Sequence, residues 1–139
     1  MGRLKTLTVL GMGTHQPIIA DGHVQTGPGL PLRADLIMPD DDGNVIVAKG
    51  LALATDTGSL ATGTYYVPCT TAETYGANTG TAVGILMNDL NATENTQPLV
   101  APATHAAALD RFCYVIGEGY GTVTDAMWTA MSSIQRRSR

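Results

Sequence analysis

The sequence predicts a small, compact, mainly β domain of the α+β class, with a short C-terminal helix and an extended N-terminal arm. Short apolar runs rich in β-branched residues alternate with turn residues, a pattern that is typical of strands. Glycines and prolines crowd the first 33 residues, and the clear helical pattern is confined to residues 124–134. The length of 139 residues favours a single folded domain.

Residues 1–33 are predicted to form the extended arm. Leu4–Leu10 can make one strand, but glycines and prolines then follow too closely for a long helix. The apolar side chains near the N-terminus suit strand addition to the sheet edge of another chain, and the two bases beside them suit an acidic surface. The predicted binding residues of the arm are Arg3, Leu4, Lys5, Leu7, Val9 and Leu10.

Residues 34–135 are predicted to form one β-rich domain that opens with a hairpin. Ala34–Met38 and Val45–Ala48 are expected to be its strands, and the polar residues 39–44 are expected to be its turn. Leu51–Ala54 is expected to continue the strand structure beyond this hairpin.

The middle of the domain contains a continuous apolar run. Thr64–Val67 is predicted to be a strand that ends at Pro68, because proline lacks the backbone N–H that a sheet needs. A loop rich in threonine and glycine is expected at residues 70–79. Thr81–Met87 is apolar without alternation and contains a glycine, which predicts a strand buried on both faces. The polar residues 88–97 are expected to be a loop.

The C-terminal third leads into the predicted helix. Residues 98–108 are rich in alanine but contain two prolines, so their secondary structure is left open. A strand is predicted at residues 111–116 and a glycine-rich turn at residues 117–121. Thr124 is predicted to cap a helix that runs to about Ile134.

The charge distribution separates basic ends from an acidic body. Five bases lie at the two ends, whereas the body holds twelve acids and three bases, so the ends carry +5 and the body −9. Residues 136–139 are accordingly predicted to form a basic tail. Charged residues make up only 14% of the chain, which favours a surface partly covered by partners. Basic ends suit an acidic partner surface, and solvated ends that bind nothing are the alternative.

The sequence gives little indication of a reactive cysteine or of a metal site. Cys69 and Cys113 each lie among apolar residues and are predicted to be buried and reduced, although the sequence leaves their pairing open. Residues 40–44 match only part of an EF-hand loop, because Met38 and Lys49 stand where its first and last ligands are needed. A solvated turn is therefore favoured, and neither a metal nor a cofactor is expected.

No set of acid, base and nucleophile stands out, so the chain is not expected to be an enzyme. The acidic body, with one Phe and one Trp, argues against direct binding of nucleic acid. No apolar run reaches the ~20 residues that cross a bilayer, so no membrane partner is expected. The alternative function is a β-rich binding module for carbohydrate or virion-surface adhesion. Such a module needs exposed aromatic side chains. The candidates are Tyr65, Tyr66, Tyr75 and Tyr120.

From about residue 30 onward, the order of motifs resembles the lambda-type head decoration proteins of tailed phages. Residues 36–48 are similar to the opening hairpin of that family, and residues 82–86 are similar to its central apolar strand. Gly119–Trp128 is similar to its closing turn and the D-x-x-W start of its helix. The stretch 51–79 is longer than the usual connection in the family, which predicts an added hairpin there.

The resemblance implies a β-tulip-like domain that is made in the host cytoplasm and binds the outer surface of the expanded phage head. The implied partners are the major capsid protein and further copies of the chain, in homotrimers that sit over joins between capsid subunits. The arm residues named above would then contact the capsid. The predicted structural core comprises Val83, Ile85, Leu86 and Trp128.

Overall fold

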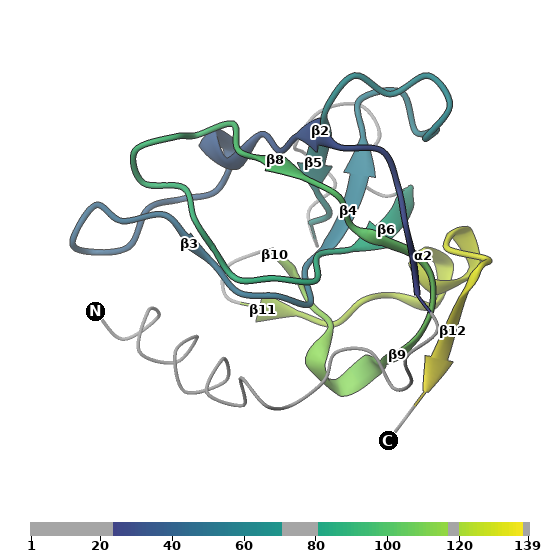
Figure 1. The fold of residues 1–139 in the computed structure, drawn as a ribbon. Coiled ribbons are helices and arrows are strands. Elements are labelled where there is room, and N and C mark those ends of the chain that lie inside the picture. The colour runs from purple at the N-terminus through teal and green to yellow at the C-terminus, as the bar shows by residue number, and fades with distance from the viewer. Residues whose placement is uncertain (1–23, 71–80, 117–119, 138–139) are drawn as a thin grey trace.

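The computed structural model describes residues 24–70, 81–116 and 120–137, and these form a mainly β domain with a short helix near the C-terminus (Figure 1). The predicted fold class is therefore confirmed. The first six strands are β1 (Gln25–Thr26), β2 (Leu30–Pro31), β3 (Ile46–Val47), β4 (Ala52–Thr55), β5 (Tyr66–Pro68) and β6 (Ala82–Ile85). The others are β7 (Leu90–Asn91), β8 (Leu99–Val100), β9 (Ala103–Leu109), β10 (Val115–Ile116), β11 (Tyr120–Gly121) and β12 (Ile134–Arg137). The helical elements are the 3-10 turns η2 (Ala34–Leu36) and η3 (Asp110–Phe112) and the helix α2 (Asp125–Ala130).

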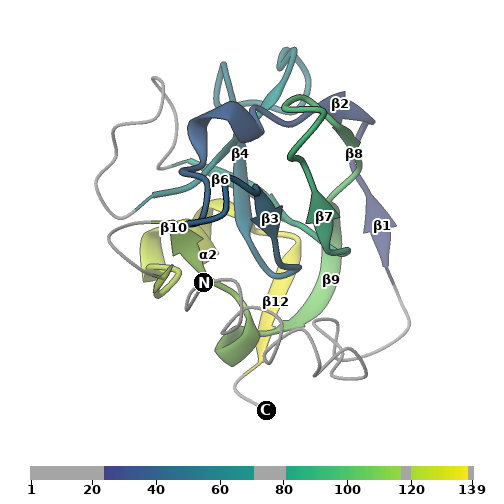
Figure 2. The same cartoon turned by 90° about the vertical axis from the view of Figure 1, so that its left-hand side faces the viewer.

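The main sheet has the strand order β1-β9-β6-β4-β5, and β12 joins it by pairing in parallel with β9. The other pairs in this sheet are antiparallel. Three two-stranded ribbons, β2-β8, β3-β7 and β10-β11, complete the domain. In Figure 2, strands β1, β2, β8 and β9 follow one another along one side of the molecule. Segments far apart in the sequence therefore make up this side.

Strands β4 and β5 of the main sheet are buried on both faces, because their successive residues point into two different cores. In β4, Ala52 and Ala54 belong to one cluster of buried side chains, whereas Leu53 belongs to the other, as the two-residue period of a strand requires. Val67 and Tyr66 of β5 divide between the two clusters in the same way. This double burial explains why the predicted strands read as apolar runs rather than as alternating patterns.

Strand β6 occupies the place in the sheet that its apolar sequence predicts. It lies between β4 and β9, and its residue Ile85 is fully buried. A steric constraint explains why the residue inside this strand at position 84 is glycine. A Cβ atom there would lie 2.6 Å from the backbone oxygen of Ala103 in β9, so only glycine lets the two strands approach this closely.

The hairpin predicted within residues 51–79 is present, as β4 and β5. Thr55 pairs with Tyr66, and Leu53 pairs with Pro68. The connecting loop is closed by Asp56, whose carboxylate accepts hydrogen bonds of 2.7 Å from both the backbone N–H and the hydroxyl of Thr64. Pro68 is the last residue of β5, at the end of the strand order, where a missing N–H is tolerated.

The predicted opening hairpin is wrong. Ala34–Leu36 forms the 3-10 turn η2 instead of a strand, and β3 pairs with β7 rather than with the preceding segment. The backbone N–H of Ala34 lies 2.9 Å from the oxygen of Thr96, so a distant loop supplies the partner of this segment. The polar turn itself is present, because the Asp40 carboxylate accepts from the N–H groups of Asp42 and Asn44.

The conformation of residues 88–108 depends on pairing with distant strands, which the sequence alone does not show. The predicted loop 88–97 contains the short strand β7, which forms because β3 is aligned beside it. The alanine-rich stretch, left open by the sequence, becomes the seven-residue strand β9. Ala106, Ala107 and Ala108 are buried, and β1, β6 and β12 all pair with this strand. Sheet pairing therefore overrides the helix propensity of alanine.

The C-terminal predictions were partly right. Residues 111–116 were expected to form one strand, but they begin with η3, and the strand is confined to Val115–Ile116. Thr124 caps α2 as predicted, with its hydroxyl accepting from the Met127 N–H at 3.2 Å. The helix ends at Ala130 rather than near Ile134. Ile134 begins β12 because its buried side chain and backbone align with Ala106 of β9.

The domain boundaries also differ from the prediction. Residues 1–23 and 138–139 lie outside the described residues. The fold already includes β1, and Leu32 is fully buried, so the boundary predicted after residue 33 falls inside the folded domain. Arg136 and Arg137, which were assigned to a basic tail, belong to β12.

Candidate functional site

The two cysteines are core residues with no reactive thiolate. Cys69 and Cys113 are free and buried, and both belong to the cluster that contains Trp128. Burial raises the pKa of each thiol to about 12, so both are neutral near pH 7 and pack as small apolar side chains. The Cys113 thiol donates to the backbone oxygen of Leu109 at 3.4 Å.

The acidic turn at residues 40–44 is organised by its own backbone. The Oδ1 atom of Asp40 accepts from the N–H of Asp42 at 2.9 Å and from that of Asn44 at 3.0 Å. Gly43 has a φ of 82°, which suits glycine in such a turn. In residues 24–70, 81–116 and 120–137, no group of three His, Cys, Asp or Glu side chains is arranged to hold a metal ion.

The predicted core residues occupy two packed regions. Ile85, Leu86 and Trp128 are buried, with exposures of 0%, 3% and 7%. Val83 is half-buried and packs against the cluster that contains Leu53 rather than lying inside it. Trp128 lies in α2, where the Thr124 cap fixes the start of the helix. The ring packs in the cluster that contains Ala52 and Ala54, from a helix whose first turn is fixed by the Thr124 cap.

Arg136 ties the C-terminal strand to two other elements. Its guanidinium contacts Asp125 of α2 at 2.7 Å and Asp110 of η3 at 3.0 Å, and it lies 5.6 Å from the centre of the Trp128 ring. The pKa of Arg136 is raised, most strongly by its hydrogen bond to Asp125 and next by its hydrogen bond to Asp110. This arginine therefore acts within the fold, a role that the prediction of a basic tail missed.

The predicted arm residues, Arg3, Leu4, Lys5, Leu7, Val9 and Leu10, lie outside the described residues. The first described residue, Val24, directly precedes β1, which pairs with β9 through Gln25 and Thr26. Both residues of β1 are exposed. The segment that was expected to reach a partner therefore joins the domain at an exposed strand of the main sheet.

Of the four tyrosines that could serve a binding module for carbohydrate, the structure describes the side chains of Tyr65 and Tyr66. Tyr66 is fully buried, and its hydroxyl donates to the backbone oxygen of Pro28 at 2.6 Å. Tyr65 is half-buried beneath Arg33, whose guanidinium carbon lies 5.4 Å from the ring centre. Arg33 is itself held by two hydrogen bonds to Asp35. Tyr75 lies outside the described residues, and Tyr120 belongs to β11.

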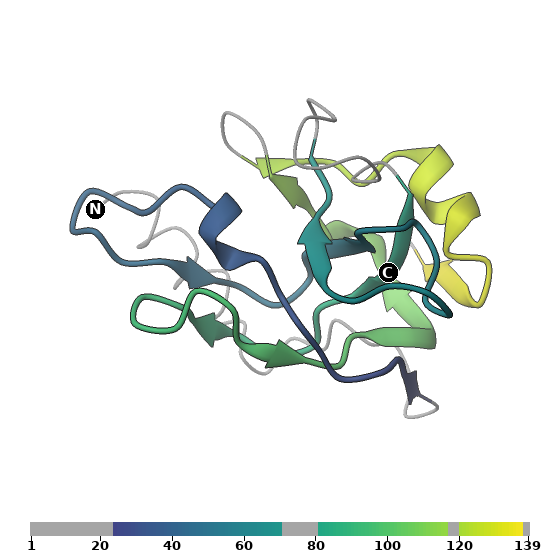
Figure 3. The ribbon, with the colours of Figure 1, turned by 90° about the horizontal axis from the view of Figure 1, so that it is seen from above.

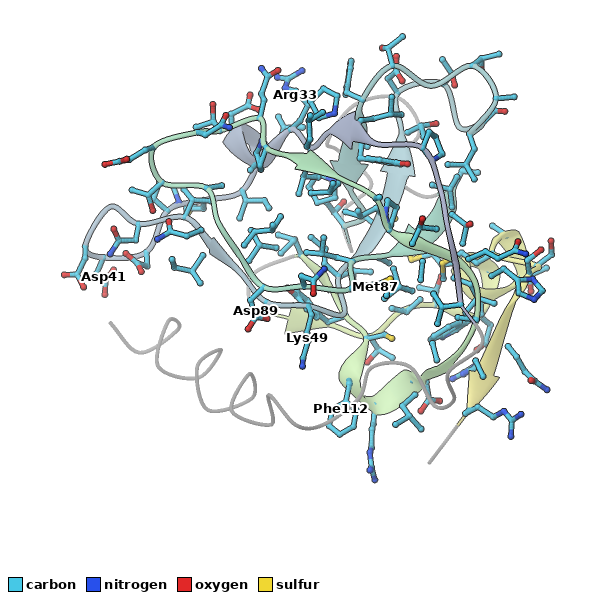
Figure 4. All side chains as sticks on the ribbon, in the orientation of Figure 1. Arg33, Asp41, Lys49, Met87, Asp89 and Phe112 are labelled. Carbon is cyan, nitrogen blue, oxygen red and sulfur yellow. The ribbon has the colours of Figure 1, made fainter. Side chains whose placement is uncertain are left out.

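Acidic side chains concentrate on a projection that we call the acidic lobe, residues 38–47 and 88–94. It consists of the β3-β7 ribbon and the loops next to it, which extend away from the main sheet (Figure 3). Figure 4 shows Asp41 near the tip of one loop and Asp89 nearer the sheet, close to Lys49. The acids of the lobe are Asp40, Asp41, Asp42, Asp89 and Glu94.

A second surface has the opposite character, and we call it the uncharged wall. It comprises residues 24–32, which contain β1 and β2, and residues 95–109, which contain β8 and β9. The two segments pair with each other along β1-β9 and β2-β8. They contain no Asp, Glu, Lys or Arg. The absence of charge from both stretches is visible in the sequence, but only strand pairing brings the two stretches together into one surface.

No protein-family model, curated protein or solved structure matches this chain in the comparisons made. Within the described residues, no helix combines the length and the apolar composition that a bilayer crossing needs.

Proposed function

We propose that this chain is a head decoration protein of a tailed phage. It binds the exterior of the expanded capsid as trimers and stabilises joins between subunits of the major capsid protein. It is not an enzyme in this proposal, and it acts on the outer surface of the virion after synthesis in the host cytoplasm.

The main support is the resemblance of the sequence motifs to lambda-type decoration proteins, together with the packing of those motifs. The central apolar strand β6 lies inside the main sheet, and the D-x-x-W motif begins a capped helix whose tryptophan is buried. Both motifs thus have a defined place in the packing of one small β domain. The opening hairpin, which was part of the resemblance, is absent from the fold and gives no support.

The proposed action follows from binding equilibrium. A protein that binds the expanded shell more tightly than the unexpanded shell stabilises the expanded state by the difference in binding free energy. A trimer makes this effect larger, because its three linked copies contact the shell at the same time and therefore bind with higher avidity than a single copy. The chain needs no chemical step for this role.

The test uses shells of the major capsid protein from the same phage, assembled without decoration protein. The full chain should sediment with expanded shells in a saturable manner and should not sediment with unexpanded shells. Crosslinking on the expanded shell, followed by mass measurement, should enrich trimers over dimers and larger species.

Absence of binding to expanded shells would contradict the proposal. Equal binding to both shell forms would contradict the stabilising role, and a crosslinked ladder without enrichment at three would contradict the trimer. Saturable binding to host-cell glycans in place of shells would favour the carbohydrate-binding module instead.

A further inference from the structure

The exposed residues of the uncharged wall are unusual because none of them is Asp, Glu, Lys or Arg. They are Gln25, Thr26, Pro28, Gly29, Asn95, Thr96, Gln97, Leu99, Ala101 and His105. Soluble protein surfaces commonly carry about a quarter to a third charged residues, whereas the centres of protein interfaces are depleted of them. His105 is the one ionisable residue in the two segments of the wall, residues 24–32 and 95–109. The composition of the wall therefore indicates a surface that is buried against another protein.

Leu99 gives this surface a large exposed apolar side chain. It is 75% exposed, the most exposed of the large apolar side chains described. It lies in β8 opposite the half-buried Pro31 of β2, and directly opposed residues of paired strands have neighbouring side chains. Exposed Ala101 follows two residues later. An exposed leucine among uncharged neighbours is the kind of anchor that an interface buries.

The exposed strand beside it points to the same conclusion. Natural proteins usually protect exposed strands with charged side chains or proline, because such strands pair with other chains. Gln25 and Thr26 of β1 are exposed and uncharged. A partner that covers β1 would remove the need for protection by charge.

We propose that the uncharged wall is the face that lies against the shell of the major capsid protein. This inference rests on the proposed function and adds the contact surface to it. The predicted binding arm joins the domain at β1, on the edge of the wall. A shell that binds the arm therefore holds the wall close to the shell surface. Because the arm and the wall belong to one chain, the contact between the wall and the shell is then effectively intramolecular.

The charge distribution favours the same orientation. The arm was predicted to bind an acidic shell surface through Arg3 and Lys5. An acidic shell repels the acidic lobe, whose five acids lie outside the wall. The wall carries no charge that an acidic shell would repel or that burial would leave unpaired. It is therefore the face best suited to lie next to the arm on the shell.

The test compares Leu99→Asp with the matched control Met38→Asp. Met38 is 69% exposed and lies on the acidic lobe, so both variants add one negative charge at an exposed apolar position. Both should melt within about 2 °C of the unmodified chain, as is usual for exposed positions. On undecorated expanded shells, Leu99→Asp should bind at least tenfold more weakly, whereas Met38→Asp should bind within about twofold of the unmodified chain.

The outcomes separate the wall from the proposed function. If the unmodified chain fails to bind expanded shells, the proposed function falls and the wall assignment falls with it. If the unmodified chain binds and the two variants are equally weak or equally strong, the wall assignment alone is overturned. If Leu99→Asp abolishes trimers while single copies still bind with unchanged affinity, the wall lies between copies, which also overturns the assignment. Ala101→Asp replaces Leu99→Asp if the latter lowers the melting temperature.

Discussion

Replacing Gly84 by alanine should destabilise the domain by forcing β6 and β9 apart. The added Cβ would lie 2.6 Å from the backbone oxygen of Ala103 and 3.2 Å from the Cβ atom of Pro102. A backbone oxygen cannot rotate away as a flexible side chain can, so one of the strands must shift. Such a shift disturbs the pairing of the two strands, because Ile85 and Ala103 are the register partners that join β6 to β9.

The magnitude follows from two opposing contributions. Inserting a methyl group into a packed region destabilises by about 1–3 kcal/mol. Alanine also restricts the unfolded chain, which stabilises by about 0.4–1 kcal/mol. Gly84→Ala should therefore lower the free energy of unfolding by about 1–2 kcal/mol. In a domain of this size, that loss lowers the melting temperature by roughly 3–7 °C.

The assay is urea and thermal unfolding of the full chain, followed by circular dichroism, with Gly29→Ala as the control. Gly29 has no heavy atom within 4 Å of the position of an added Cβ, so its replacement keeps the unfolded-state effect and lacks the clash. Gly29→Ala should be neutral or slightly stabilising. If the two variants have the same stability, the close approach of β6 and β9 does not limit the fold, and the explanation of this glycine is refuted.

Three further predictions concern other parts of the chain. Trp128→Ala should lower the free energy of unfolding by about 3–5 kcal/mol because the ring is buried; a change near zero in urea titration would contradict its core position. Since burial raises the pKa of Cys69 and Cys113 to about 12, their contribution to stability should be complete below about pH 9 and fall as the pH rises toward 12. Unfolding from pH 8 to 11 measures this fall, and the double variant to alanine should lack it. Deleting residues 2–14 should leave the melting temperature unchanged and reduce occupancy on expanded shells; unfolding of the free protein would instead assign the segment to the core.

The elements predicted correctly are those that short stretches of sequence determine. The Thr124 cap, the turn at residues 40–44 and the apolar strand β6 depend on residue types within a few positions of each other. In the same way, Val45–Ala48 contains β3, because β-branched residues favour the extended backbone. Local preference and final structure agree at these positions.

The elements predicted wrongly depend on partners that lie far away in the sequence. β3 pairs with β7, more than forty residues later, so the sequence offered no reason to prefer it over the nearer segment. Ala34–Leu36 turns as η2 while Arg33 holds Asp35 by two hydrogen bonds, and propensity does not report such a contact. The alanine-rich β9 shows the same limit, because its neighbours in the sheet decide its conformation.

The separation of charge from the wall reconciles solubility with the proposed contact surface. A free protein with an uncharged, partly apolar face tends to associate with itself, and a chain with only 14% charged residues has few means of preventing this. The acidic lobe concentrates five acids in a projection outside the wall, so copies of the free protein repel one another without any charge being placed on the wall. Spreading the same acids evenly would protect the free protein equally well, but it would put unpaired carboxylates into the proposed contact with the shell. Concentrating them in the lobe satisfies both requirements, and this is why we regard the lobe and the wall as two parts of one arrangement.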